Sequence, residues 1–308
     1  MSARVVQSEL AALAVLDRNG AGGTCDDSGH VVSVDISAKP NVNDFIHVLG
    51  WMPFLQTIRA ANSPISDAGM THLRQLERLE TVYASYVRFS GDSLENLENC
   101  TRLRAFFCDV KQAADRGAEL LARMTSIEEL SLSRSDVSEE GLRYVGKMRR
   151  LEKLSLTGTS ITTAGVRALA PLGRKLKELT LEETSLDDNA MEIISLAFPC
   201  LESLFVGSEL TDRGVSFLGK MDSLKVLGLS SRRISDSGLQ FLGAMPGLQE
   251  LIIGRTSITD AGLVSLYNAA SLRLLWAHGS LVSDEGLRKL KAHLPLCDVG
   301  LDDPCDEE

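Results

Sequence analysis

The sequence predicts an α/β protein built as a right-handed solenoid, a horseshoe with a parallel sheet on its concave face and helices on its convex face. A 24-residue repeat runs through residues 41–301 and makes about eleven repeats. Within each repeat, apolar residues first follow helical spacing and then alternate as they do in a short strand. A hydroxyl residue followed by an aspartate marks the start of several of the helical segments.

Apolar residues recur at positions 1, 6, 9, 12, 15, 18 and 20 of each repeat. Positions 6 to 12 fit one face of a helix, and positions 18 and 20 fit one face of a strand, so each repeat predicts one helix and one strand. The fourth repeat fills every position, with Ala113, Ala118, Leu121, Met124, Ile127, Leu130 and Leu132. The repeats begin at Asn41, Ile65, Phe89, Ala113, Val137, Ile161, Leu186, Leu210, Ile234, Ile258 and Val282.

Helix starts are predicted at Ser66-Asp67, Thr211-Asp212, Ser235-Asp236, Thr259-Asp260 and Ser283-Asp284. The hydroxyl is a preferred N-cap, and the carboxylate suits the positive end of the helix dipole, so we expect these aspartates to act as capping residues rather than metal ligands. A glycine often precedes position 6, where it would let adjacent coils approach closely. Phosphate-binding loops of the forms G-x-x-x-x-G-K-[ST] or strand-G-x-G-x-x-G do not occur.

A single repeat has too little apolar surface to fold alone, so its stability must come from stacking on its neighbours. Helices are wider than strands spaced about 4.8 Å apart, so the stack is expected to curve with its strands inside. Residues 1–40 are predicted to cap the first coil. Val6, Leu10, Leu13 and Leu16 form one face of a helix that Asn19-Gly20 ends, glycines 20–23 form a flexible connection, and residues 30–36 form a strand.

The composition limits the kind of partner. A formal charge of -10 and a pI near 5.1 argue against nucleic acid and anionic membranes, and favour a neutral or basic protein or peptide. No cofactor or metal motif occurs, and the beginning of the chain lacks the layout of a signal peptide, so a cytoplasmic location is expected. Residues 302–308 form an acidic tail that we expect to be solvated.

The six cysteines show no metal-ligand spacing. Cys100, Cys108 and Cys200 occupy repeat positions that should face the core, where cysteine behaves as a small apolar residue. Cys25, Cys297 and Cys305 lie near the ends, and a disulfide between the last two stays open. Reduced thiols are expected in a cytosolic protein.

The face of the predicted sheet that points away from the core is the most informative surface. Because strand side chains alternate, position 19 of each repeat must lie on this face. Several of these residues are aromatic, and exposed aromatic residues are typical anchors of binding surfaces. Position 19 reads Arg59, Tyr83, Phe107, Ser131, Ser155, Thr180, Phe205, Gly228, Ile252, Trp276 and Gly300.

Carboxylates on the same face predict an acidic docking surface between aromatic ends, which would steer a basic peptide. They include Glu129, Glu178 and Glu182, and paired carboxylates for acid/base catalysis are the weaker interpretation. The residues predicted to bind a partner are Arg59, Tyr83, Phe107, Asp109, Glu129, Glu178, Glu182, Phe205, Trp276 and His278; no catalytic residue is predicted.

Three other sets of residues carry predictions of their own. Hydroxyls at Ser135, Thr159, Thr184, Thr256 and Ser280 suit bonding to the turning backbone. Arg134, Arg232, Arg233 and Arg255 belong to a basic rim, solvated or able to bind phosphate or carboxylate. Of the histidines, His72 is expected to face solvent and His293 to fill a core slot.

A period in the twenties carrying L-x-x-L-x-L is the leucine-rich-repeat signature. Ile258-Thr-Asp-Ala-Gly-Leu263 and its variants resemble the leucine-rich repeats of planctomycete-type bacterial proteins, and Phe198-Pro-Cys-Leu-Glu-Ser-Leu204 resembles the cysteine-containing subfamily of F-box proteins. The resemblance covers residues 41–301 and implies protein binding through the concave face. In F-box relatives it also implies substrate capture for a ubiquitin ligase, but the first 40 residues have no F-box-like Leu-Pro start.

The leading hypothesis is therefore a non-enzymatic protein-interaction scaffold. The alternatives are a regulator of a small GTPase that inserts an arginine from the basic rim, and a substrate receptor similar to the F-box proteins.

Overall fold

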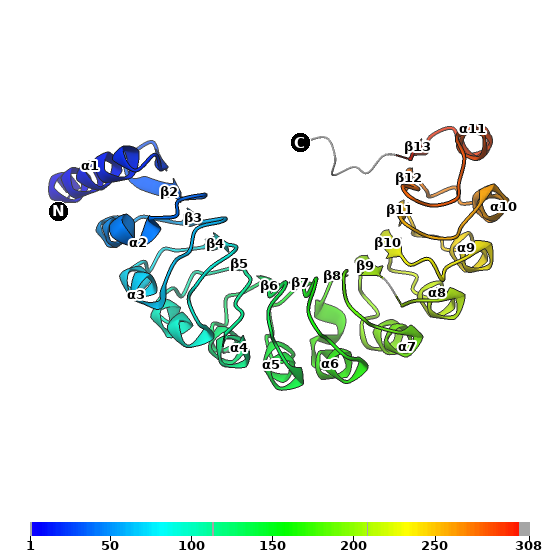
Figure 1. Ribbon diagram of the computed structural model, residues 1–308, viewed down its shortest axis with the longest axis horizontal. Coiled ribbons are helices and arrows are strands. Elements are labelled where there is room, and N and C mark those ends of the chain that lie inside the picture. The colour runs from blue at the N-terminus through cyan, green and yellow to red at the C-terminus, as the bar shows by residue number, and fades with distance from the viewer. Residues whose placement is uncertain (1, 113, 208, 302–308) are drawn as a thin grey trace. The chain divides into compact units, whose positions relative to one another are not determined.

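A computed structural model of the protein describes residues 2–112, 114–207 and 209–301. The chain divides into two compact units, an N-terminal unit of Met1–Ser155 and a C-terminal unit of Leu156–Glu308. Within each unit the strands lie along one side and the helices along the other (Figure 1). Among the described residues, no helix has the length and apolar composition needed to cross a membrane.

The N-terminal unit holds seven strands that follow one another across the sheet in the order of the sequence. Strand β1 is antiparallel to β2, and all later pairs in this unit are parallel. The elements are α1 (Ser2–Arg18), β1 (Gly22–Cys25), β2 (Val31–Asp35), α2 (Val42–Phe45), η1 (Ile46–Trp51), β3 (Thr57–Arg59), α3 (Asp67–Met70), η2 (Thr71–Leu73), β4 (Thr81–Ala84), η3 (Gly91–Leu97), β5 (Ala105–Cys108), α4 (Ala114–Arg123), β6 (Glu129–Ser131), α5 (Glu139–Val145) and β7 (Lys153–Ser155), where η denotes a 3₁₀ helix.

The C-terminal unit continues the same alternation, and its strand pairs are parallel. Its elements are α6 (Thr163–Ala168), η4 (Ala170–Lys175), β8 (Glu178–Leu181), α7 (Asp188–Ala197), β9 (Ser203–Gly207), α8 (Asp212–Leu218), β10 (Val226–Ser230), α9 (Asp236–Leu242), β11 (Glu250–Ile253), α10 (Asp260–Leu263), η5 (Val264–Leu266), β12 (Leu274–Trp276), α11 (Asp284–His293) and β13 (Asp298–Gly300).

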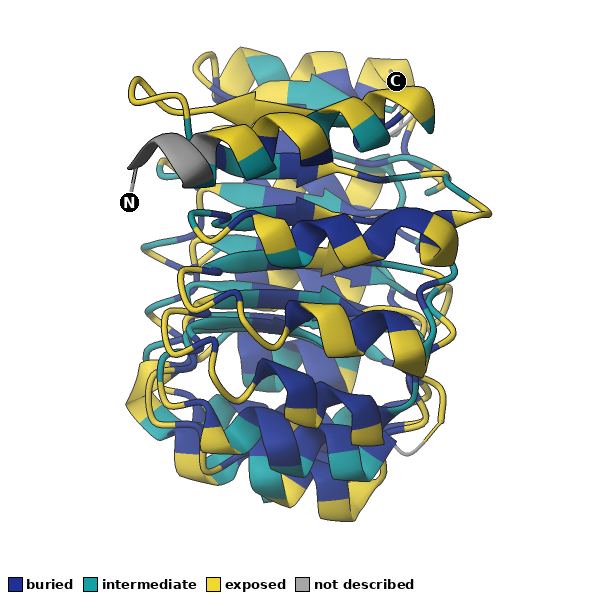
Figure 2. Cartoon of the chain, turned by 90° about the vertical axis from the view of Figure 1, so that its left-hand side faces the viewer, coloured by how far each residue is buried: buried dark blue, intermediate teal, exposed yellow. Residues whose placement is uncertain are grey.

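The predicted repeat is confirmed, because strands β3 to β13 supply one strand to each repeat from residue 41 onward. In the fourth repeat the residues from Ala118 to Leu132 that were predicted to face the core are buried, whereas Ala113 lies outside the described residues. Buried and exposed residues alternate along the helices, as an amphipathic pattern requires (Figure 2). Several repeats replace part of the predicted α-helix with a 3₁₀ helix, the form that short helical segments often take.

The predicted N-caps are confirmed, and the aspartates that follow them lie in the first helical turn as expected, but several of these aspartates also bond to the next repeat. The hydroxyl of Ser235 accepts a hydrogen bond from a backbone N–H of its own helix, whereas the carboxylate of Asp212 accepts bonds from the N–H and hydroxyl of Ser235 in the next repeat, at 2.8 and 2.6 Å. The other pairs of this kind are Asp115–Ser138, Asp188–Thr211, Asp236–Thr259 and Asp260–Ser283. The aspartates therefore join consecutive repeats.

These carboxylates also explain the repeated glycine. A Cβ placed on Gly238 would lie 2.7 Å from Oδ1 of Asp212, which is too close for a non-bonded contact. The same close approach joins Gly141 to Asp115 and Gly262 to Asp236. The prediction that glycine lets adjacent coils approach is confirmed, and we call the set of these contacts the aspartate–glycine ladder.

The predicted hydroxyl bonds to the turning backbone are also confirmed. Ser135, Thr159 and Thr184 are buried and donate to the carbonyl oxygens of Leu132, Leu156 and Leu181, at 2.6 to 2.7 Å. Thr256 and Ser280 donate in the same way, to Ile253 and Ala277. Each bond satisfies a carbonyl group at the point where the chain leaves the sheet.

The N-terminal cap differs from the prediction in two ways. Glycines 20–23 were expected to be a flexible connection, but Gly22–Cys25 form β1, which pairs with β2. Leu10 is 59% exposed, whereas Glu9 is 1% exposed and accepts a hydrogen bond from Nδ1 of His30 at 2.9 Å. Apolar spacing missed the buried carboxylate because its partner lies 21 residues further along the chain.

The last repeat contains a shift of one residue. His293 was predicted to fill a core slot, but it is exposed and stacks on Tyr267, with ring centroids 3.7 Å apart. Leu294 and Cys297 are buried instead, because α11 continues to His293 and the chain leaves the helix at Leu294. Pro295 follows that residue, and proline disfavours a helical residue before it, so the sequence held a signal for this boundary.

Candidate functional site

The candidate site is the sheet face, which we define in each unit as the side of the strands that points away from the helices. In the N-terminal unit one row of this face runs from Asp35 through Arg59, Tyr83, Phe107 and Ser131 to Ser155, in direct register. This is the register that the repeat alignment predicts.

Three members of this row form a stack. The rings of Tyr83 and Phe107 are 4.8 Å apart and nearly parallel, at 5°, and the guanidinium of Arg59 lies 5.7 Å from the centre of the Tyr83 ring. Tyr83 is 39% exposed. The residue opposite Phe107 on the next strand is Ser131, whose short side chain joins a hydroxyl chain with Ser133 and Ser155 at 2.9 Å per contact. The N-terminal unit therefore presents an aromatic stack beside a hydroxyl cluster.

Two predicted partner-binding carboxylates of this unit contact other groups of the protein. Asp109 accepts hydrogen bonds from the backbone N–H groups of Tyr86 and Val87, at 2.7 and 3.3 Å, and so holds the turn after β4. Glu129 pairs with Lys153 at 3.5 Å. Both carboxylates have structural partners, which lowers the negative charge that they offer to another molecule.

In the C-terminal unit the corresponding row is Thr180, Phe205, Gly228, Ile252, Trp276 and Gly300. The rings on this row lean across neighbouring strands. The ring of Phe205 occupies the space above Gly228, and the ring of Trp276 occupies the space above Gly300. The ring of His278 likewise lies against Gly254. Because each glycine lacks a side chain, the ring can pack directly against the backbone of the sheet.

Carboxylates border these rings. Glu178, Glu250 and Asp298 lie on the row before Phe205 and Trp276, and Glu182 follows the end of β8. Val226 and Leu274 share the row with Glu250 and are partly exposed. The C-terminal unit therefore combines apolar and acidic side chains on one face.

The predicted basic rim consists of exposed residues, described here within each unit. In the N-terminal unit Arg134 has a left-handed backbone with φ of 56°. In the C-terminal unit Arg233 pairs with Glu209 at 2.9 Å, while Arg232 and Arg255 are also exposed. Part of the rim is thus neutralised by the protein itself.

The described cysteines are free, and burial raises the pKa of the Cys100 thiol to about 12 and that of Cys297 to about 11. Cys108 is also buried, as predicted, but Cys200 is partly exposed because the neighbouring Leu201 takes its core position. Cys305, the predicted possible partner of Cys297, lies outside the described residues, as does the rest of the acidic tail.

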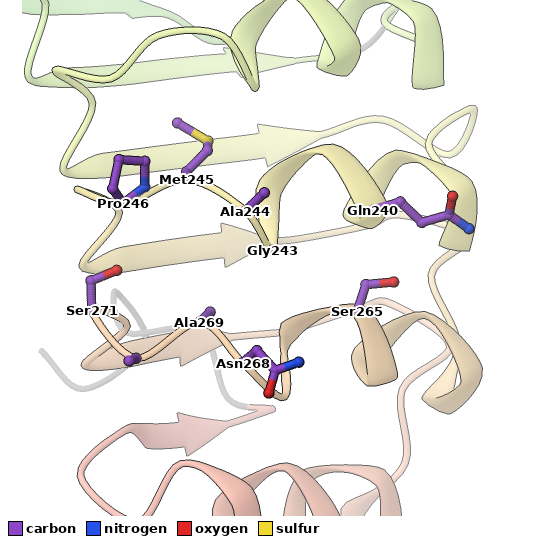
Figure 3. A pocket seen from close by; sticks show the side chains of 10 residues that line it. Gln240, Gly243, Ala244, Met245, Pro246, Ser265, Asn268, Ala269 and Ser271 are labelled. Carbon is purple, nitrogen blue, oxygen red and sulfur yellow. The ribbon is translucent and has the colours of Figure 1, made fainter.

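A cavity lies outside the sheet face, between the segments that follow α9 and α10 (Figure 3). Its lining includes Gln240, Ser265, Asn268 and Ser271, together with small or apolar residues. Within residues 2–112, 114–207 and 209–301, no cluster of three or more histidine, cysteine, aspartate or glutamate side chains is arranged to hold a metal ion.

Comparison with known proteins supports the fold. A family profile described as "Leucine Rich repeat" matches residues 147–170. A crystal structure of an internalin from Listeria monocytogenes is similar, with a TM-score of 0.54 and 16% sequence identity over 96% of this chain and 94% of that chain. No curated protein sequence matches the chain. The fold is thus that of a leucine-rich-repeat solenoid, and the planctomycete-type and F-box resemblances stay predictions.

Proposed function

We propose that this protein is a non-enzymatic scaffold that binds a neutral to basic protein or peptide through its sheet face. The observation that carries the proposal is the set of aromatic side chains held on that face, away from the core. Tyr83 and Phe107 stack in the N-terminal unit, and Phe205 and Trp276 are partly exposed in the C-terminal unit. Large aromatic side chains in such places are typical anchors of protein interfaces.

The proposal includes a cytoplasmic location. It is supported by the free thiols of Cys100, Cys108 and Cys297, which are packed as small apolar groups rather than joined in disulfides. Fractionation of native cells followed by detection of the protein tests this part, and recovery from the culture medium would contradict it.

Partner capture by crosslinking in native cells tests the binding role. We expect the double variants Tyr83→Ala/Phe107→Ala and Phe205→Ala/Trp276→Ala to keep the circular dichroism of the wild type and, in at least one case, to lose the captured partner. The matched control is Leu196→Ala, which removes a side chain that is 77% exposed on α7. Full capture of the partner by both double variants would show that the sheet face is not the binding site.

The rival hypothesis of GTPase regulation has its own test. It requires an exposed arginine such as Arg232 or Arg255 to act in trans on bound nucleotide. We expect purified protein to leave the hydrolysis rates of candidate small GTPases unchanged. A rate increase that Arg255→Ala abolishes would replace the scaffold proposal with the regulatory one.

A further inference from the structure

We propose that the sheet face of β8–β13 binds an extended peptide segment whose lysine or arginine residues are spaced about four residues apart, with apolar residues between them. This inference rests on the proposed scaffold function and identifies one of its sites and the chemistry of the partner. It concerns only the C-terminal unit.

The site begins with a continuous apolar platform. Phe205, Val226, Ile252, Leu274 and Trp276 occupy adjacent positions on β9 to β12, and each is partly exposed. These side chains do not belong to the buried core, which lies on the other side of the same strands. There the strands contribute Leu204, Leu227, Leu251 and Leu275. An apolar patch of this kind on a folded surface commonly marks a binding site.

Glycine shapes this platform. Because the rings of Phe205 and Trp276 fill the spaces above Gly228 and Gly300, they are held close to the sheet rather than extended into solvent. A ring that is already in place loses little conformational entropy when a partner binds. Aromatic rings also attract the cationic groups of lysine and arginine.

The charges on the platform have one sign. Three rows of side chains on β8–β13 point away from the helices: the row of Glu178 and Glu250, the row of Phe205 and Trp276, and the row of Glu182 and His278. Their described carboxylates are Glu178, Glu182, Glu250 and Asp298, and the rows contain no lysine or arginine. Among the described residues Glu250 has no ion pair, whereas Asp298 contacts Lys291 at 3.3 Å.

Two basic residues near the platform are paired with carboxylates. Lys225, at the start of β10, pairs with Glu202 at 2.6 Å, and Arg233, beyond its end, pairs with Glu209 at 2.9 Å. Because the charged side chains on the rows of the platform itself are carboxylates, the platform favours a cationic segment over an acidic one.

The distance between strands sets the distance between carboxylates on one row, and therefore the expected spacing of lysine or arginine residues in the peptide. Glu178 and Glu250 lie on the same row three strands apart, which corresponds to about 14 Å at 4.8 Å per strand. An extended peptide rises about 3.4 Å per residue, so cations about four residues apart would match these two carboxylates.

A second copy of this chain fits the site less well than a basic peptide. The chain carries a formal charge of -10, so another copy would bring like charge to the platform. An extended segment, in contrast, can cross the strands and reach Glu178 and Glu250 in turn.

The two tryptophans of the chain allow a direct measurement, because Trp51→Phe leaves Trp276 as the only tryptophan and places it at the site. The probe is a nine-residue acetylated peptide with lysine at its first and fifth positions, leucine at its third and seventh, and serine elsewhere. Titration into the Trp51→Phe protein should change the Trp276 fluorescence in a saturable way. Added salt should weaken this binding.

Three comparisons test the chemistry. Glu250→Gln should weaken the probe by about two- to fivefold, whereas Glu192→Gln, an exposed carboxylate on α7, should leave its affinity unchanged. A peptide of the same composition with its lysines adjacent should bind several-fold more weakly, and a peptide with glutamate for lysine should not bind.

Specific outcomes would overturn the inference. These are the absence of a saturable signal, equal affinity for the spaced and adjacent lysine peptides, or equal affinity for wild type and Glu250→Gln. If the peptide results are negative while Tyr83→Ala/Phe107→Ala still abolishes partner capture, the scaffold proposal stands and only this site is wrong. Retained capture in both double variants would instead contradict the scaffold proposal itself.

Discussion

The aspartate–glycine ladder makes a prediction whose sign is opposite to that of an ordinary helix. Gly238 lies in the first turns of α9, and alanine in a helix is usually more stable than glycine by about 1 kcal/mol. Here the added methyl group would lie 2.7 Å from Oδ1 of Asp212 and 3.2 Å from Cγ2 of Ile234. The carboxylate must therefore move.

The magnitude follows from the bonds that this movement breaks. Asp212 accepts hydrogen bonds from the N–H and hydroxyl of Ser235, and each such bond contributes about 1 kcal/mol. Water can partly replace them, because Asp212 is partly exposed. After the gain in helix propensity is subtracted, Gly238→Ala is expected to destabilise the C-terminal unit by about 1 kcal/mol.

Urea unfolding followed by Trp276 fluorescence in the Trp51→Phe background measures this change. In an Asp212→Ala background the obstacle is gone, so Gly238→Ala should be neutral or stabilising by up to about 1 kcal/mol. Ser237→Ala, at the exposed neighbouring position, controls for helix propensity alone. If Gly238→Ala stabilises the protein equally in both backgrounds, the ladder does not constrain this glycine.

Three further predictions concern the buried Glu9–His30 pair, the hydroxyl bonds in the turns and the cysteines. His30→Ala should destabilise the N-terminal unit by about 1 to 3 kcal/mol by leaving Glu9 buried without its partner, and Glu9→Leu should restore part of that loss, measured by Trp51 fluorescence in a Trp276→Phe background. Thr159→Val should cost about 1 kcal/mol, seen as a lower urea midpoint at an unchanged slope. In a Cys305→Ser background at pH 8, Cys25 should react with a thiol reagent at once, whereas Cys100 should react only after denaturation. The reason is that burial and a raised pKa suppress the Cys100 thiolate. Fast labelling of both cysteines would contradict the described packing.

The repeat was predictable because the position of a residue within its own coil determines whether its side chain is buried. A leucine at position 18 faces the core in every repeat whose strand begins at the same place, so aligned residues such as Leu130, Leu154 and Leu227 are buried alike. The position-19 row followed from the same alternation, and the register confirms it within each unit. The N-cap hydroxyls were predictable for the same reason, since a cap acts on the next few residues.

Other features depend on contacts between residues that are distant in the sequence. The Gly22–Cys25 strand has almost no side-chain pattern, and only its partner β2 makes it a strand. The direction in which Phe205 leans depends on the glycine opposite it, and the charge that Glu129 offers depends on Lys153 in the next repeat. These features set the shape and charge of the candidate site.

By itself the sequence determined the solenoid, its repeat boundaries and the residues that face away from the core, because periodicity acts within a single coil. Only the tertiary structure decided that the aspartates join one repeat to the next, that Asp109 and Glu129 have partners within the protein, and that aromatic rings rest above glycines. Each of these depends on which side chain stands about 24 residues away on the neighbouring coil, at a distance and orientation that only the stacked repeats define.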